Sequence, residues 1–172
     1  MIKASVAEGT CTIEFARPDK KNALTAAMYA AAADAVAAAV ADDAVRVLLF
    51  TGGAQVFTAG NDLGDFLERP PMSADAPVFR FMQGVAACPK PVVAAVNGAA
   101  IGIGTTLLLH CDLVYLGEGA KLMLPFVSLG VVPEFASSLL LPARLGHARA
   151  AAVLMLGEPL PPREALASGI AT

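Results

Sequence analysis

One isolated carboxylate is the side chain in this sequence best placed to move a proton. Glu134 is the only charged residue between Lys121 and Arg144. An apolar setting raises the pKa of a carboxyl group toward the range in which it can take up and return a proton near neutral pH. The alternative is a structural glutamate in the first turn of a helix, where the helix dipole favours acidic side chains and lowers their pKa.

Two glycine turns supply backbone N–H groups that could bind an oxygen atom. The turn at 59–63, Ala-Gly-Asn-Asp-Leu, comes just before a predicted helix, so the N–H of Asn61 has no partner within that helix. The turn at 97–104, Asn-Gly-Ala-Ala-Ile-Gly-Ile-Gly, does the same for Ile103. Two such donors form an oxyanion hole if the fold brings the turns together. Ordinary tight turns are the alternative, because glycine-rich turns between strand and helix are common.

Two other clusters of polar residues are weaker candidates for a functional site. His110-Cys111-Asp112 are consecutive and cannot all point at one ion, so no metal site is predicted. Ser137-Ser138 with His147 lack the Gly-x-Ser-x-Gly turn that exposes a hydrolase nucleophile, so we expect them to be ordinary helix residues.

Length and composition predict one folded domain, residues 1–172. The chain has a mass of 17.5 kDa, with 56% hydrophobic and 16% charged residues, which excludes an intrinsically disordered protein. The net charge of -3 and the pI near 5.3 leave no basic surface for nucleic acid, so no nucleic-acid partner is expected.

The cysteines and the N-terminus predict a cytoplasmic protein. The 3 cysteines are odd in number and lie apart in apolar runs, which is typical of free thiols in a reducing compartment. An acidic residue, Glu8, interrupts the N-terminus before an apolar signal segment can form. The uncharged stretch 91–109 approaches the length of a membrane span, but its proline and glycines divide it into shorter elements, so no membrane association is expected.

Strands and helices alternate along the chain, which predicts an α/β fold with functional loops after the strands. A hairpin is expected over 5–7 and 10–15, turning at Glu8-Gly9, and a helix capped by Thr25 is expected to run to about Ala41. Further strands are predicted at 45–50, 91–96 and 112–115. Further helices are predicted at 76–87, 102–110, 148–156 and 163–167, and a short helix is predicted after 57–63. One more helix is expected to begin at Pro133 or Glu134 and to run toward Leu145.

Four motifs in this order resemble the crotonase (enoyl-CoA hydratase/isomerase) superfamily: Arg17-Pro18 with Asn22-Ala23-Leu24, then 57–63, then 91–98 with Gly102, then 111–115. The resemblance implies a spiral of ββα units that binds acyl-CoA thioesters, with the N–H groups of Asn61 and Ile103 stabilising a thioester enolate. It implies coenzyme A as part of the substrate rather than a separate cofactor, and a homotrimer or a dimer of trimers. The residues implied to contact coenzyme A are Ala59, Gly60, Asn61, Asp62, Leu63, Lys20 and Lys21, although the two lysines could equally belong to a solvated loop.

The resemblance also implies a particular reaction. Hydratases of this family use two glutamates, whose positions align here with Thr106 and Phe126. The run from Pro125-Phe126 through Pro133-Glu134 to Ser137-Ser138 is similar to the 3,2-trans-enoyl-CoA isomerase branch, where one glutamate is the only acid/base, as in the β-oxidation of unsaturated fatty acids. Glu134 is therefore the expected catalytic residue. Alternatives are hydration, thioester hydrolysis, or a non-catalytic subunit that binds coenzyme A or serves in assembly.

The C-terminus departs from the family pattern. Family members usually continue past the position of Ser168-Gly169-Ile170 with helices that cover the acyl-CoA site, whereas this sequence stops at Thr172. We therefore expect the C-terminal helical region to be truncated.

Overall fold

A hairpin at the start of the chain forms one edge of a five-stranded sheet. The computed structural model describes residues 1–172, and in it β1 (Ile2–Ala7) and β2 (Thr10–Phe15) pair antiparallel. The turn between them, Glu8-Gly9, adopts left-handed backbone angles, with φ of 50° and 78°. The predicted hairpin is confirmed.

Three strands extend this sheet in parallel. They are β3 (Val47–Thr51), β4 (Val92–Val96) and β6 (Leu113–Leu116), and the strand order is β1-β2-β3-β4-β6. All three lie close to the bounds predicted from the sequence. Side chains along β3 and β4 alternate between buried and half-buried, as expected for central strands covered on both faces.

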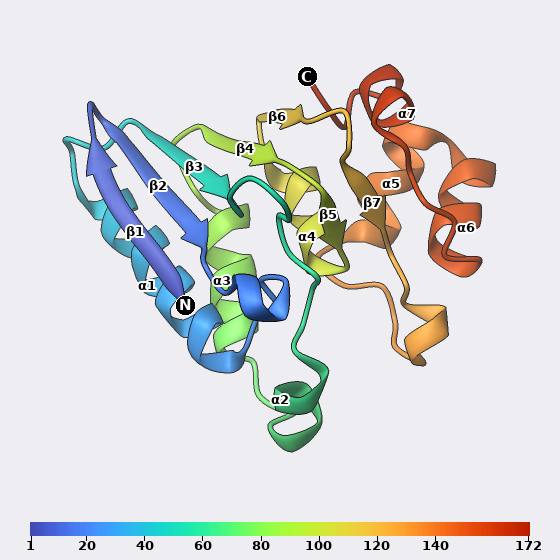
Figure 1. Ribbon diagram of the computed structural model, residues 1–172, viewed down its shortest axis with the longest axis horizontal. Coiled ribbons are helices and arrows are strands. Elements are labelled where there is room, and N and C mark those ends of the chain that lie inside the picture. Colours follow the sequence, from blue (N-terminus) through green and yellow to red (C-terminus); the bar gives the residue numbers. More distant parts are fainter.

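Helices α1 (Ala26–Ala41) and α3 (Pro77–Ala86) pack together against one face of this sheet (Figure 1). The predicted cap of α1 is confirmed, because Thr25 Oγ1 accepts a hydrogen bond from Met28 N at 3.3 Å. Aromatic rings from both layers fill the space between helices and sheet, with centroid distances of 5.3 to 6.2 Å: Phe15, Phe50, Phe57, Phe81 and Tyr29.

A second, two-stranded sheet stands beside the first. It pairs β5 (Ala99–Ile101) with β7 (Lys121–Met123) in parallel. Neither strand was predicted, because each is only three residues long and 97–104 looks like a glycine turn. Directly after β5 the chain forms α4 (Ile103–Thr106), which continues as the 3₁₀ helix η2 (Leu107–His110), in agreement with the helix expected at 102–110.

The C-terminal third forms a group of helices next to β7 (Figure 1). Its main helix α5 begins at Ser137, so the prediction that it starts at Pro133 or Glu134 is wrong. Phe135 and Ala136 have φ of 52° and 53°, and these left-handed angles cannot continue a right-handed helix. Helix α5 ends at Leu145. The remaining helices of the chain are η1 (Pro18–Lys20), α2 (Leu63–Glu68), η3 (Val127–Leu129), α6 (His147–Met155) and α7 (Pro162–Ala167).

The uncharged stretch 91–109 is divided among β4, β5, α4 and η2. No helix in the structure has the length and apolar character needed to span a membrane.

Helix α4 approaches the segment before α2 so closely that Gly104 has no room for a side chain. A Cβ atom there would lie 2.5 Å from Thr58 Cγ2. Gly104→Ala should therefore lower the free energy of unfolding by about 1–3 kcal/mol, although alanine is the better helix former. Thr58→Ser removes Cγ2 and keeps the hydroxyl, so the double variant should recover most of the loss. Urea denaturation of the four proteins measures this, and purely additive losses would show that the contact is not the cause.

Candidate active site

The first predicted N–H donor lies on an extended segment held from both edges. On one edge Leu24 N donates to Gly60 O at 2.8 Å, and Asp62 N donates to Leu24 O at 2.8 Å. Alternate backbone groups of an extended segment point to opposite edges, so the N–H of Asn61 points away from Leu24, toward β5. On that edge Ile101 N donates to Thr58 O at 3.0 Å. The N–H of Asn61 donates no hydrogen bond within the protein.

The second predicted donor lies at the end of β5. Ile103 is the first residue of α4, and its N–H also has no partner, whereas the carbonyl of Gly102 accepts from Thr105 N at 2.8 Å. Thr58 pairs with Ala100 in a parallel bridge. Asn61 and Ile103 follow Thr58 and Ala100 by the same number of residues, so they lie at matching positions on neighbouring segments.

The two turns are in contact. A Cβ on Gly60 would lie 2.9 Å from Ile101 O, so the backbones approach as closely as a glycine permits. The structure therefore brings together the two turns that the sequence suggested, with both free N–H groups at the same end of a parallel pair. This is the arrangement that an oxyanion hole requires.

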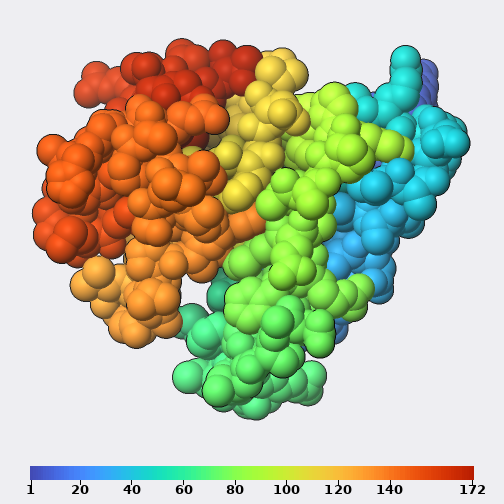
Figure 2. Space-filling view, turned by 180° about the vertical axis from the view of Figure 1, so that it is seen from behind, coloured from blue at the N-terminus to red at the C-terminus, as the bar shows by residue number.

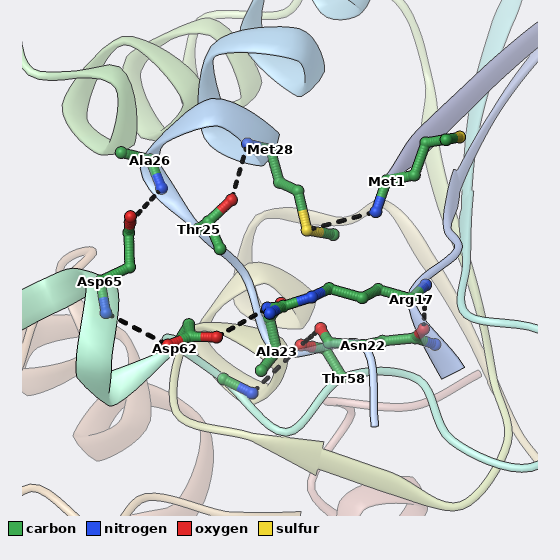
Figure 3. A network of polar contacts seen from close by, with 11 residues as sticks. Met1, Arg17, Asn22, Ala23, Thr25, Ala26, Met28, Thr58, Asp62 and Asp65 are labelled. Atoms are coloured by element: carbon green, nitrogen blue, oxygen red, sulfur yellow. Dashed lines mark hydrogen bonds and ion pairs between the residues drawn. The ribbon is translucent and has the colours of Figure 1, made fainter. Parts of the chain in front are cut away.

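A buried amide holds the first segment in place. Asn22 Nδ2 donates to Gly52 O at 2.8 Å and to Val56 O at 2.9 Å, and Oδ1 accepts from Arg17 N at 2.7 Å. Thr58 Oγ1 in turn donates to Asn22 O at 2.7 Å (Figure 3). Asn22 belongs to a motif that marks the family resemblance, and the structure shows that it ties three loops together.

An ion pair anchors the far end of the same segment (Figure 3). Arg17 Nη1 lies 2.7 Å from Asp62 Oδ2, and Asp62 Oδ1 accepts from Asp65 N at 3.2 Å as the cap of α2. The hydrogen bond from Arg17 lowers the pKa of Asp62, which stays ionised. Asp65 Oδ2 accepts from Ala26 N at 2.6 Å, linking α2 to the start of α1. Asp62 is therefore the N-cap of α2 as well as the partner of Arg17.

Glu134 presents one bonded and one unbonded carboxylate oxygen. Thr106 Oγ1 donates to Oε1 at 2.7 Å, whereas Oε2 is buried and accepts no hydrogen bond from the protein. Burial raises the pKa of Glu134 to about 7, and the hydrogen bond from Thr106 opposes this rise. The apolar stretch around Glu134 predicts the same direction. The first-turn explanation does not apply, since α5 begins only at Ser137.

The backbone that carries Glu134 is fixed by hydrogen bonds and is strained. Ser137 donates to Glu134 O from both N, at 3.0 Å, and Oγ, at 2.7 Å. His110 Nε2 donates to Phe135 O at 2.9 Å, and the two rings stack with centroids 3.8 Å apart. The left-handed angles of Phe135 and Ala136 cost about 1–2 kcal/mol each. Such strain next to a reactive group is typical of functional sites.

A tyrosine that the sequence did not indicate also belongs to this region. Tyr29, on the buried side of α1, donates its hydroxyl hydrogen bond to Asn61 Oδ1. Its pKa is raised well above the ordinary value, first by burial and then by the negative charge of Glu134. No local pattern distinguishes Tyr29 from the other buried residues of this helix.

The residues implied to contact coenzyme A surround the first turn. Ala59 N donates to Lys21 O at 2.9 Å, so the loop carrying Lys20 and Lys21 lies directly beside 59–63. Both lysines are exposed and take part in no ion pair. Phe126, which the family resemblance aligns with a hydratase acid, is buried.

These groups together can hold an oxygen and move a proton. Two unpaired N–H groups stabilise negative charge on an oxygen, and a carboxylate with a pKa of about 7 exchanges protons at neutral pH. Figure 2 shows an opening between the segment around 127–132 and the helices α2 and α3, with atoms from the region of residue 60 at its base. No group of three or more His, Cys, Asp and Glu side chains is arranged to hold a metal ion.

The raised pKa of Glu134 makes the stability of the fold depend on pH. Below its ordinary pKa of 4.5 the carboxyl is protonated in both folded and unfolded chains. Between 4.5 and about 7 the unfolded chain ionises first, so the free energy of unfolding falls as pH rises and stays low above 7. Glu134→Gln removes this penalty and should stabilise the protein by about 2–3 kcal/mol at pH 8, and by much less at pH 4.5.

Urea denaturation at the two pH values measures the difference. Glu118→Gln is the matched control, because Glu118 is exposed. An equal effect of Glu134→Gln at both pH values would contradict the burial of this carboxylate.

Comparison with known proteins agrees with this architecture. Residues 5–172 match the model of the enoyl-CoA hydratase/isomerase family. The structure of OdaA from Pseudomonas aeruginosa superimposes with a TM-score of 0.96 at 57% identity, covering 99% of this chain and 69% of that one. The predicted crotonase-like spiral is confirmed.

Among curated proteins, enoyl-CoA delta isomerase 2 of Rattus norvegicus is 39% identical over 170 residues, which is 95% of this chain and 43% of that protein. The 1,2-epoxyphenylacetyl-CoA isomerase of Escherichia coli is 35% identical over 171 residues, 95% of this chain and 65% of that protein. Other relatives at 34% identity are named enoyl-CoA hydratases. The chain thus spans 43% to 65% of the length of the two isomerases. It belongs to the enoyl-CoA hydratase/isomerase family, the crotonase superfamily.

Proposed function

We propose that this protein isomerises 3-enoyl-CoA thioesters to 2-trans-enoyl-CoA thioesters, with Glu134 as the single acid/base. The observation that carries the proposal is the buried, unbonded Oε2 of Glu134, with a pKa of about 7. The other oxygen of this carboxylate is bonded to Thr106 on α4, the helix that begins at Ile103 and its unpaired N–H. Relatives named enoyl-CoA delta isomerase, from Rattus norvegicus and Homo sapiens, support this class of reaction.

The two N–H groups stabilise charge on the thioester. When the C2 proton leaves, negative charge spreads through the conjugated chain onto the thioester oxygen. The N–H groups of Asn61 and Ile103 donate hydrogen bonds to that oxygen, and a donor oriented in advance is worth about 3–4 kcal/mol. Both donors belong to backbone fixed by neighbouring hydrogen bonds, so little reorganisation accompanies the reaction.

Glu134 then carries one proton between two carbons. Oε2 takes a proton from C2, which leaves a planar dienolate, and returns it to C4, so that the double bond moves from C3–C4 to C2–C3. The carboxylate ends as it began, and no oxidant or reductant is consumed. The reaction needs no cofactor beyond the coenzyme A of the substrate. A pKa near the working pH suits a group that is base and acid in turn.

Hydration fits these residues less well. Adding water across a double bond needs one group to deprotonate the water and another to supply a proton, a task normally divided between two carboxyls. Thr106 and Phe126 stand at the positions of the family's two glutamates. Thr106 directs its hydroxyl to Glu134, and the Phe126 side chain has no exchangeable proton.

The proposal also covers how coenzyme A binds and how the subunits assemble. Residues 59–63 line the path of coenzyme A, and Lys20 and Lys21 neutralise its phosphates as point charges. Assembly as a homotrimer or a dimer of trimers would cover a run of exposed apolar side chains in and after η3: Val127, Leu129, Val131 and Val132.

Removing the carboxylate tests the reaction. Glu134→Ala and Glu134→Gln should each lower kcat for a 3-enoyl-CoA by about 10²–10⁴-fold, because general acid–base catalysis contributes that much. Formation of the 2-enoyl thioester is followed with a coupled hydratase and dehydrogenase. The dissociation constant for a saturated acyl-CoA, measured by calorimetry, should change only a few-fold.

Glu118→Gln serves again as the matched control and should keep full activity. Normal isomerisation by Glu134→Ala would overturn the assignment. Binding without turnover in the wild-type protein would instead favour a non-catalytic subunit.

Thr106 should set the pH at which Glu134 works. Its hydrogen bond lowers the pKa of Glu134, so Thr106→Val should raise that pKa and move the rising limb of kcat/KM against pH upward by about one unit. Thr106→Ser keeps the hydroxyl and should restore the profile. An unchanged profile in Thr106→Val would mean that Thr106 does not bond to Glu134 in the reacting enzyme.

A further inference from the structure

The hydroxyl of Tyr29 has a specific partner in an otherwise apolar setting. The side chain is buried between α1 and α3, and its ring centroid lies 5.8 Å from that of Phe81. Phenylalanine would fill this space equally well, and burying a hydroxyl is unfavourable unless it is hydrogen-bonded. The only hydrogen bond of Tyr29 outside the backbone goes to Asn61 Oδ1, on the turn that carries the first N–H donor.

This hydrogen bond orients the Asn61 amide. Because Oδ1 accepts from Tyr29, the two N–H groups on Nδ2 point away from Tyr29, and they donate to no atom of the protein. Asn61 is half-buried, and Nδ2 is not among the polar atoms enclosed without a partner, so it is accessible to a ligand. Asn61 therefore offers its backbone N–H toward β5 and a separate pair of N–H donors from its side chain.

Asn61 lies close to the elements that hold Glu134. Glu134 is bonded to Thr106 on α4, and Ile103, the first residue of α4, lies beside Asn61 across the parallel contact. In the proposed reaction, an acyl chain with its thioester oxygen on the N–H of Asn61 and its C2–C4 carbons at Glu134 would run close to the side chain of Asn61.

We propose that the Asn61 amide, held by Tyr29, is a subsite for an oxygen substituent on the acyl chain, and that the preferred substrates carry a hydrogen-bond acceptor just beyond C4. This inference rests on the proposed isomerase function and adds the class of substrate. A plain hydrocarbon chain leaves both Nδ2 donors unpaired when it excludes water, whereas an ether, hydroxyl or carbonyl oxygen satisfies one of them.

A pair of substrates that differ by one atom group tests the subsite. In 5-methoxy-3-pentenoyl-CoA an ether oxygen replaces one CH₂ of 3-heptenoyl-CoA, with the length and double bond unchanged. The wild-type protein should prefer the ether by roughly tenfold in kcat/KM, the value of one partly exposed hydrogen bond. Tyr29→Phe and Asn61→Ala should bring the ratio close to one. Any effect of a variant on the shared chemical step cancels in this ratio.

Two controls separate the possible failures. Tyr115→Phe removes the hydroxyl of the other, exposed tyrosine and should leave the ratio as in wild type. The saturated pair 5-methoxypentanoyl-CoA and heptanoyl-CoA, measured by calorimetry, reports the subsite without catalysis. If the wild-type protein isomerises neither enoyl substrate but binds 5-methoxypentanoyl-CoA about tenfold more tightly than heptanoyl-CoA, the subsite is supported and the isomerase function is contradicted. No preference in wild type, or a preference that survives in both variants, overturns the subsite.

Discussion

The parallel contact between the 58–61 segment and β5 is the constraint around which the site is arranged. It places the two N–H donors side by side, although the donors are far apart in sequence. The contact depends on two glycines: Gly60 lies against the backbone carbonyl of Ile101, and Gly104 of α4 lies against the side chain of Thr58. The buried amide of Asn22 and the ion pair between Arg17 and Asp62 then fix the ends of this segment. Polar groups beside the site thus fix the backbone that carries the N–H of Asn61.

Burial of the Glu134 carboxylate lowers the stability of the fold. Burial of Glu134 raises its pKa, leaves Oε2 without a hydrogen bond, and is accompanied by two strained residues, Phe135 and Ala136. A fold optimised only for stability would avoid each of these features. Ser137 and His110 offset part of the cost by bonding the strained backbone. The unfavourable burial and backbone strain are thus concentrated around Glu134, the group that has to be fixed in position and shielded from water.

Local signals in the sequence predicted the elements that depend on local physics. Thr25 caps α1 because a side-chain oxygen satisfies a nearby N–H, and Glu134 stands out as one charge in a long apolar stretch. Strands β5 and β7 escaped prediction because three residues carry no periodicity, and their partners lie far along the chain. The start of α5 was misplaced because left-handed angles at Phe135 and Ala136 arise from tertiary contacts. Tyr29 was missed for the same reason, since its partner is across the core.

The number of titratable groups in the site limits its chemistry more strictly than the fold does. One scaffold in this superfamily supports different reactions, so the backbone donors alone do not choose among them. Thr106, which the family resemblance aligns with a hydratase glutamate, has no carboxyl group and donates its hydroxyl hydrogen bond to Glu134. A single carboxylate with one bonded and one unbonded oxygen can remove a proton and then return one. Moving a double bond requires only one such group, which is the physical basis of the proposed isomerase function.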